Sequence, residues 1–285
     1  ELSIYGTGGY SSLEYTFNRA AMPPETEFVP KANKTSGGLG IGYTFSFHPY
    51  LQQWNIVTGA ELSSYSAGGT MNAIAESSPN RYSSNGRYEE MLFNSVITEY
   101  SEKQKVTYFQ IPLMLEFRMP KFDKHKWYVA AGAKFGFVFS DVARFAGNYT
   151  AKADRLVTTG YLPAGDETLS DMPDNGFVNI ANTSWNGDLD FGLNVSLTAE
   201  TGLRWALSDC WGIYAGIFVD YGLKNISPEK TVGSIVNYQE TRPRAFAYNS
   251  VLTAQHSSGE AYVDKINLLS IGLKVKIGLR LGTGN

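Results

Sequence analysis

The sequence predicts an all-β fold, a closed antiparallel up-and-down barrel of about eight strands that crosses a membrane. Three observations predict it. Apolar and polar residues alternate over long runs, and the links between the runs are alternately short and long. Composition is the third observation, because 14% of the residues are aromatic, 29 are glycine, and only 18% are charged against roughly 25% in a typical soluble domain.

Strict alternation defines eight runs. They cover residues 2–17, 38–48, 53–66, 107–118, 127–140, 189–205, 211–224 and 268–281. In the run 107–118, for example, Phe109 and Leu113 share one face, while Gln110 and Glu116 lie on the other. Soluble strands usually have about five or six residues. Roughly 13 residues at a tilt near 40° rise about 33 Å, enough to cross an apolar band about 25 Å tall. The first run is the least regular, and its parity is expected to shift near Gly8 and Gly9, as a β-bulge would cause.

The polar face of the runs carries glycine, small residues and charges of both signs. The lumen of a narrow barrel needs this composition, because about eight strands leave little space inside. We therefore expect buried acidic and basic side chains to pair there. The acidic residues are Glu61, Glu116, Asp190, Glu200 and Asp220, and the basic ones are Arg118, Lys134, Arg204, Lys274, Lys276 and Arg280. A lumen filled in this way argues against a solute pore.

The links between runs favour a membrane barrel over a soluble sandwich, which has the same two-residue period. The short links are 49–52, 120–126 and 207–210, and the long ones are about 19–37, 67–103, 141–187 and 225–263. This is the asymmetry of short periplasmic turns and long extracellular loops. Four tryptophans lie at the short-turn end, where they would form an aromatic girdle: Trp54, Trp127, Trp205 and Trp211.

Two strands carry a resemblance to a known family. Residues 108–117, YFQIPLMLEF, resemble the "IPL" strand of the outer-membrane β-barrel domains common in Bacteroidetes, including OmpA-like and PorT-like proteins. Residues 127–136, WYVAAGAKFG, resemble the strand that follows it, and residues 269–281 are similar to the closing strand. The resemblance implies a Gram-negative outer membrane with both termini in the periplasm.

We treat residues 1–285 as a single barrel domain. Many barrels of this family are followed by a peptidoglycan-binding domain, and residues 281–285 lack the terminal aromatic often seen when the last strand ends the protein. A periplasmic domain after Asn285 and a natural terminus there remain two alternatives.

Several residues are candidates for a catalytic, metal-binding or partner-binding site. The possible catalytic bases are His48, His125 and His256, and the possible carboxylate pair is Asp188 with Asp190. Oxygen ligands suited to Ca²⁺ occur at Asp166, Glu167, Asp171, Asp174 and Asn175, but without the spacing of a calcium loop. A basic turn, which could touch a periplasmic partner, contains Lys121, Lys124, His125 and Lys126. For each of these sets, the favoured interpretation is an ordinary structural or solvated one, so no catalytic, cofactor or metal residue is predicted.

The function predicted is a non-enzymatic structural anchor or adaptor whose long external loops make the contacts. Segment 82–88, YSSNGRY, has the Tyr, Ser, Asn and Gly composition of an adaptable contact surface. The expected partners are outer-membrane lipid or lipopolysaccharide, peptidoglycan through a following domain, or other envelope proteins. The net charge of −3 argues against nucleic acid, and the single Cys210 excludes an internal disulfide. The alternatives are a subunit of a secretion or assembly complex and a small lipid- or peptide-processing barrel enzyme.

Overall fold

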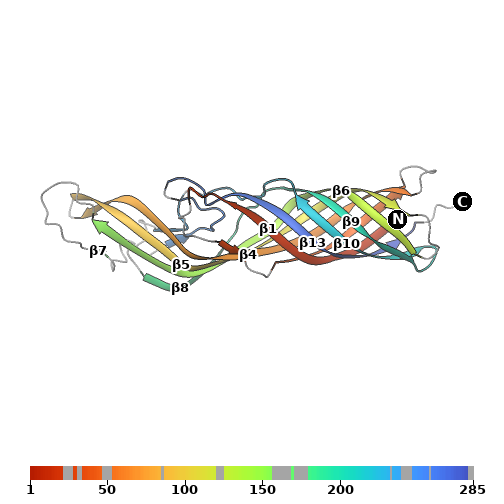
Figure 1. Ribbon diagram of the computed structural model, residues 1–285, viewed down its shortest axis with the longest axis horizontal. Helices are drawn as coiled ribbons and strands as arrows, with labels where there is room; N and C mark the ends of the chain where they lie inside the picture. Colours follow the sequence, from red (N-terminus) through yellow and green to blue (C-terminus); the bar gives the residue numbers. More distant parts are fainter. Residues whose placement is uncertain are drawn as a thin grey trace.

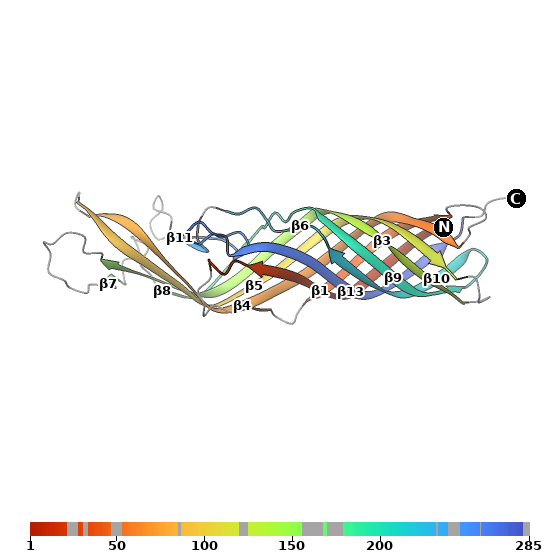
Figure 2. The same ribbon diagram turned by 45° about the horizontal axis from the view of Figure 1, so that its top comes forward.

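The computed structural model describes residues 1–21, 28–30, 34–46, 53–84, 87–119, 125–155, 168–169, 179–231, 233–238, 246–256 and 258–281. Within these residues the fold is all-β, and no helix is long and apolar enough to cross a bilayer. The molecule is elongated, and both chain ends lie at one end of it (Figures 1 and 2).

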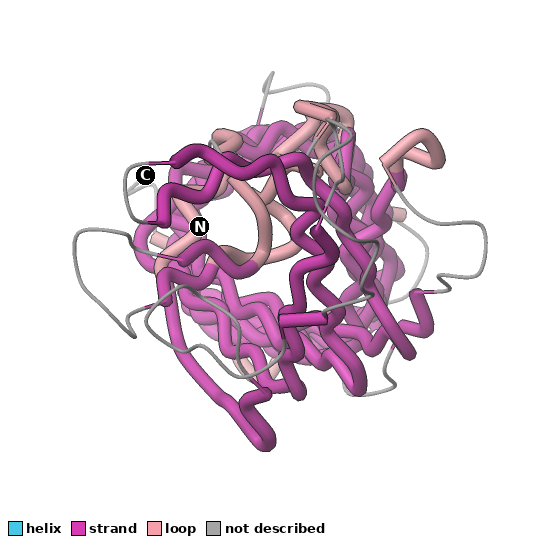
Figure 3. Tube along the Cα trace, turned by 90° about the vertical axis from the view of Figure 1, so that its left-hand side faces the viewer, coloured by secondary structure: helices cyan, strands magenta, loops and turns pink. Residues whose placement is uncertain are grey.

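Eight strands form a closed ring. They are β1 (Leu2–Phe17), β3 (Thr35–Ser46), β4 (Trp54–Ser84), β5 (Arg87–Arg118), β6 (His125–Arg155), β9 (Asn194–Ala206), β10 (Trp211–Gly222) and β13 (Val263–Leu279). Each strand pairs antiparallel with the next in the chain, and β13 pairs with β1 to close the ring. Figure 3 shows this ring along the long axis of the molecule. The predicted up-and-down barrel is confirmed.

An apolar band surrounds the barrel because outward positions alternate with inward ones. Side chains such as Ile4, Leu39, Leu113 and Leu273 are exposed on the outside. The three short turns connect β3 to β4, β5 to β6 and β9 to β10. Of the predicted girdle, Trp54, Trp127 and Trp211 are exposed at the short-turn end, and Trp205 is partly exposed there.

Inward glycines make room for large side chains in the lumen. Gly40 lies opposite Tyr5, and a Cβ atom at position 40 would lie 2.4 Å from Cζ of Tyr5. The missing side chain therefore lets the Tyr5 ring extend across the lumen, where it is buried.

The parity shift expected near Gly8 and Gly9 is wrong. β1 pairs with β13 in one register from Leu2 to Thr16, and the register shifts only between Thr16 and Phe17. The apolar pattern inverts for another reason. Ile4 and Tyr10 are exposed on the outer band, whereas Leu13, farther along the strand, is buried in an internal core. The strand keeps its geometry while its surroundings change.

Among the described residues, the predicted long loops 67–103 and 141–187 are largely strands instead. β4 and β5 are 31 and 32 residues long and pair in one constant register from Trp54–Phe117 to Ser84–Arg87, and β6 has 31 residues. Beyond the barrel they form a sheet with β2 (Phe28–Pro30), β7 (Thr168–Leu169) and β8 (Asn179–Gly187). We call residues 67–84 of β4, 87–106 of β5 and 141–155 of β6, together with these three short strands, the wing (Figures 1 and 2).

The run predicted at 189–205 begins as a strand only at Asn194. Leu189 and Phe191 lie in the preceding connection and are buried rather than lipid-facing. Asp190 between them is exposed with a φ of 49°. The apolar alternation here reflects packing of an irregular segment onto the core and not a membrane strand.

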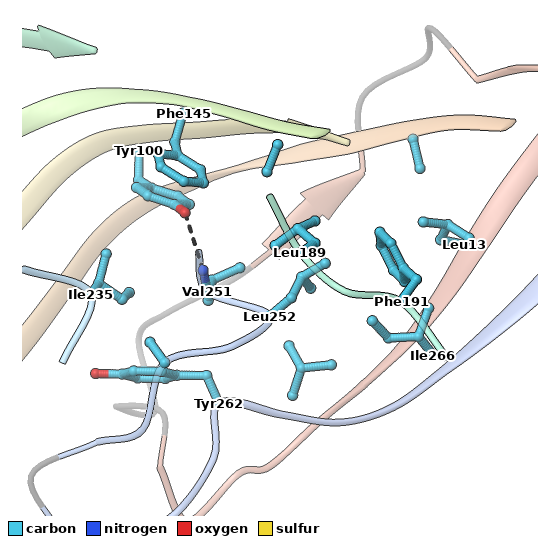
Figure 4. Packing of buried hydrophobic residues seen from close by; sticks show 14 of the residues in the cluster. Leu13, Tyr100, Phe145, Leu189, Phe191, Ile235, Val251, Leu252, Tyr262 and Ile266 are labelled. Atoms are coloured by element: carbon cyan, nitrogen blue, oxygen red, sulfur yellow. Dashed lines mark hydrogen bonds between the residues drawn. The ribbon is translucent and has the colours of Figure 1, made fainter. Parts of the chain in front are cut away.

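The last long connection folds back over the barrel. We call its described residues within 225–262 the cap, which contains the hairpin of β11 (Val236–Tyr238) and β12 (Phe246–Tyr248). Ile226, Ile235, Val251, Leu252 and Tyr262 of the cap are buried in one apolar cluster with residues of the barrel and wing (Figure 4). The other members of the cluster include Leu13, Tyr65, Met71, Ile74, Ile97, Tyr100, Val106, Tyr108, Phe145, Leu189, Phe191 and Ile266.

Candidate functional site

The lumen is filled by ion pairs stacked along the barrel. In the first group, Lys134 Nζ lies 2.9 Å from Oδ2 of Asp220 and 3.5 Å from Oε2 of Glu61. Glu61 also accepts hydrogen bonds from the hydroxyls of Tyr5, at 3.1 Å, and Ser63. All of these side chains are buried, so each charge is compensated within the protein.

A second group lies nearer the short-turn end. Lys274 Nζ donates to Oε2 of Glu200 at 2.7 Å, and the Tyr128 hydroxyl donates to the other oxygen of that carboxylate at 2.7 Å. Lys276 Nζ lies 3.5 Å from Glu116 and 4.1 Å from the centre of the Tyr214 ring. The cations are therefore held by both carboxylates and aromatic faces.

The third group closes the short-turn end. Arg118 pairs with Glu116 at 2.5 Å and with Glu1 at 3.2 Å. The Tyr214 hydroxyl donates to Glu1 at 2.5 Å and accepts from Nε of Arg204 at 2.9 Å. Ion pairs and tyrosines thus cross-link the lumen and leave it packed rather than open.

Most of the predicted lumen pairs are confirmed, but Arg204 donates to the Tyr214 hydroxyl rather than to a carboxylate, and two further residues are placed differently. Asp190 lies in the β8–β9 connection, exposed and without an ion pair among the described residues, so the prediction that it pairs inside the lumen is wrong. Arg280 follows β13 and is exposed. The alternation missed the role of the tyrosines and of Glu1, although Tyr5, Tyr128 and Tyr214 do fall on the polar face of their runs.

At the wing end, one carboxylate fastens the cap. Glu102 on β5 is fully buried and accepts hydrogen bonds from the Ser250 hydroxyl at 2.5 Å and the Val251 amide at 3.2 Å. Tyr100 and Gln104 of β5 also donate to it, at 2.5 and 2.8 Å. Tyr100 receives the Val251 amide at 3.3 Å as well, as Figure 4 shows. Burial raises the pKa of Glu102 above its usual range, although the hydrogen bonds from Ser250, Tyr100 and Gln104 lower it.

A lysine braces the cap from within. Lys230 Nζ donates to the carbonyl oxygens of Leu252 at 2.7 Å and Val263 at 2.6 Å and to the Ser227 hydroxyl. Burial lowers the pKa of Lys230. The cap is therefore a hydrogen-bonded unit seated on an apolar core, and it covers the end of the lumen opposite the Arg118 group.

The candidate catalytic residues do not form a triad among the described residues. His256 Nδ1 lies 3.0 Å from Oγ of Ser258 and accepts the Ser258 amide, while its ring meets the Tyr262 ring edge-on. No carboxylate is seen to orient the imidazole in the described part of the cap. Asp188 is exposed just after β8, His125 is exposed at the start of β6 by the short turns, and His48 lies outside the described residues.

The remaining candidates add no described site. The acidic loop residues Asp166, Glu167, Asp171, Asp174 and Asn175, for which the sequence favours a solvated loop over a calcium site, all lie outside the described residues, as do Lys121 and Lys124. Cys210 is free and exposed in the β9–β10 turn. No group of three His, Cys, Asp or Glu side chains suited to a metal occurs in the described ranges.

An apolar groove marks the outer surface near the short turns. It is lined by Trp54, Leu115, Phe117, Val129 and Ala131 of β4, β5 and β6. The rings of Trp54 and Phe117 are 4.9 Å apart at its edge. This surface belongs to the apolar band.

Comparison with known proteins identifies a matching family and solved structures with low TM-scores. No curated protein matches the chain. Neisserial surface protein A (NspA) aligns with a TM-score of 0.32 and 9% identity over 97% of this chain and 96% of that one. The outer membrane protein OprG from Pseudomonas aeruginosa aligns with a TM-score of 0.34 and 12% identity over 96% and 95%. A model of the outer membrane protein β-barrel domain matches residues 1–212. The chain therefore belongs to the outer membrane protein β-barrel domain family.

Proposed function

We propose that this protein is a non-catalytic anchor in the outer membrane that presents its wing to a partner outside the cell. The observation that carries the proposal is the continuity of β4, β5 and β6 from the apolar band into the wing. At about 3.3 Å per residue, residues 67–84 alone extend the sheet by about 60 Å along the strand. A contact surface made from the barrel's own strands is held in a fixed direction relative to the membrane.

The filled lumen supports an anchor over a channel. Lys134, Lys274, Lys276 and Arg118 bridge facing walls of the barrel, and the cap covers the wing end. We infer that the wing faces outward and both termini face the periplasm, because short turns at the end with the termini are typical of outer-membrane barrels.

The test removes the tip of the wing without touching the core. Glu76 and Ser95 are cross-strand partners. Replacing residues 77–94 by Asn-Gly joins the two strands by a two-residue hairpin turn. Ile74 and Ile97, which contact the cap core, are retained. The variant is expected to fold, judged by heat-modifiable migration in gels, and to lose envelope proteins that co-purify with the unmodified chain in mild detergent.

A control variant replaces the lysines of the basic turn, K121A/K124A/K126A. It is expected to keep the same co-purifying proteins. If the shortened wing keeps every partner, the adaptor proposal is wrong.

The second candidate is a subunit of a secretion or assembly complex that is contacted from the periplasm. The same experiment tests this candidate. Loss of partners from K121A/K124A/K126A that the variant lacking residues 77–94 retains would support a complex contacted from the periplasm. Lipopolysaccharide, other envelope proteins and peptidoglycan are the partners we propose. Reading the gene past Asn285 tests whether a peptidoglycan-binding domain follows the barrel.

We also propose that the protein is not an enzyme. The only described Ser–His pair, Ser258 with His256, is two residues apart in one turn and has no orienting carboxylate among the described residues. Release of free fatty acid or peptide by the purified protein, abolished by H256A, would overturn this.

A further inference from the structure

Three cations gather on the outer face of the sheet just beyond the apolar band. Lys103 and Lys105 of β5 and Arg144 of β6 are all exposed. Lys103 lies directly opposite Arg144 in the antiparallel ladder, and Lys105 is two residues nearer the barrel on the same face. None of the three forms an ion pair with a residue that the structure describes.

This pairing is costly for the protein alone. Like charges directly opposite on neighbouring strands destabilise a sheet. In the lumen the three lysines each have a carboxylate partner, such as Asp220 for Lys134. At the Lys103–Arg144 pair, an anion between the two side chains would remove the repulsion.

The position of the cluster relates it to the membrane surface. Lys105 is four residues from Phe109 on the same face of β5, which at about 3.3 Å per residue and a tilt near 40° is about 10 Å in height. Next to it on β6, Phe139 is 69% exposed and Phe137 is 50% exposed. The cations above match the anionic headgroup of a lipid, and the exposed aromatic rings below match its acyl chains.

Four described carboxylates lie near the cluster. Asp141 points inward and accepts the amide of Phe191. Glu99 lies farther out on β5, and Asp188 and Asp190 are exposed on the connection beside β6. They flank the cluster on its far sides but do not separate Lys103, Lys105 and Arg144 from one another.

Two exposed lysines elsewhere on the barrel, Lys265 and Lys224, do not belong to this cluster. Lys265 on β13 is exposed, but Asp264 is its neighbour in sequence, and Glu14 on β1 lies two residues from the position opposite Lys265, on the same face. Lys224, just after β10, is also exposed. These two lysines serve as a matched control.

We propose that Lys103, Lys105 and Arg144 bind the phosphorylated headgroup of an outer-leaflet lipid, whose acyl chains lie along Phe109, Phe137 and Phe139. The guanidinium of Arg144 can hold a phosphate through two parallel hydrogen bonds, and the lysines supply point charges. The inference rests on the proposed outward direction of the wing but not on any protein partner of the wing.

The test measures lipid retained by the folded protein in mild detergent by native mass spectrometry. The probes are bis-phosphorylated lipid A and the same lipid without its phosphates. Each cation near a membrane surface contributes roughly fivefold in affinity, so K103A/K105A/R144A is expected to bind lipid A on the order of a hundredfold more weakly. The K224A/K265A variant is expected to bind like the unmodified protein.

Further outcomes decide the assignment. Equal binding of the dephosphorylated lipid, or equal losses in both variants, would overturn the proposal. Strong competition by inorganic phosphate would show a site for free anions and overturn the lipid assignment. Removing the negative charges of Asp188 and Asp190 should not weaken the binding of an anion. A loss of lipid binding in D188N/D190N would therefore contradict direct contact between the cations and the phosphate. Protease cleavage of the wing on intact cells tests the direction separately, so a failed orientation is distinguishable from a failed lipid site.

Discussion

The hydroxyl of Ser250 donates a 2.5 Å hydrogen bond to the carboxylate of Glu102, although 148 positions separate the two residues. The same carboxylate receives the amide of Val251, so one side chain of the wing binds two consecutive residues of the cap. Since Glu102 is fully buried without a described cationic partner, these donors are what compensate its burial. This group therefore fastens the cap to the wing.

Glu102→Ala is expected to loosen the cap while the barrel stays folded. The substitution removes the acceptor of the hydrogen bonds from Ser250 and Val251, each worth about 0.5–1.5 kcal/mol even to a neutral carboxyl group. Amide hydrogen exchange at Val251 and Leu252 should therefore speed by about tenfold or more. Glu14→Ala, which alters an exposed glutamate on β1, is the control and should leave exchange unchanged. Unaltered exchange in Glu102→Ala would mean that the apolar cluster alone holds the cap.

The cap should be more stable in acid. Burial raises the pKa of Glu102 in the folded protein above its unfolded value of about 4.3, so folding favours its protonated form. The stabilisation is fully present below the unfolded pKa and is lost as pH rises through the folded pKa. Burial also raises the pKa values of Tyr100 and Tyr15, which stay neutral throughout. Val251 exchange, corrected for its intrinsic rate, should therefore slow between pH 7 and pH 4, and Glu102→Gln should abolish this dependence. A persistent dependence in Glu102→Gln would assign it to another group.

The barrel could be predicted from the sequence because lipid imposes one rule on every strand. Inside the band, outward residues such as Leu113 are apolar and inward ones such as Glu116 are polar, and the alternation reports this directly. The same rule predicted the pairing of Lys134, Lys274 and Lys276 with inward carboxylates. Which carboxylate each lysine meets depends on strand register and tilt, and these are not encoded in a two-residue period.

Beyond the band the rule changes, and prediction failed there. Strands β4 and β5 continue with the same geometry, but their outer face now carries residues such as Lys103, while the inner face packs Met71 and Tyr100 under the cap. The apolar side has switched from outside to inside. Leu189 and Phe191 were misplaced for the same reason, since an apolar residue facing a core is indistinguishable in sequence from one facing lipid.

Lys134→Met should destabilise the barrel strongly. The substitution leaves Asp220 and Glu61 buried without their shared cation, and breaking a buried pair costs about 3–5 kcal/mol. Urea unfolding in lipid vesicles, followed by tryptophan fluorescence, measures the change. Lys126→Met, at the partly exposed start of β6, is the control and should change stability by less than about 0.5 kcal/mol. The triple variant K134M/D220N/E61Q should recover much of the loss, and equal instability of the triple variant would contradict the ion-pair explanation.

Gly132→Ala tests whether close backbone approach, rather than flexibility, explains the glycines of the barrel wall. A Cβ atom at position 132 would lie 2.1 Å from the carbonyl oxygen of Leu113 and 2.6 Å from Cα of Met114 on β5. These are backbone atoms of a paired strand, so β5 and β6 would have to move apart. We expect a loss of about 1–3 kcal/mol in the free energy of unfolding, as overpacking of a core costs.

Gly8→Ala is the matched control, because a Cβ there has no atom within 4 Å. It should be neutral or slightly stabilising, since alanine loses less conformational entropy than glycine on folding. Equal effects of the two substitutions would show that strand propensity, and not the approach of Leu113, sets the cost.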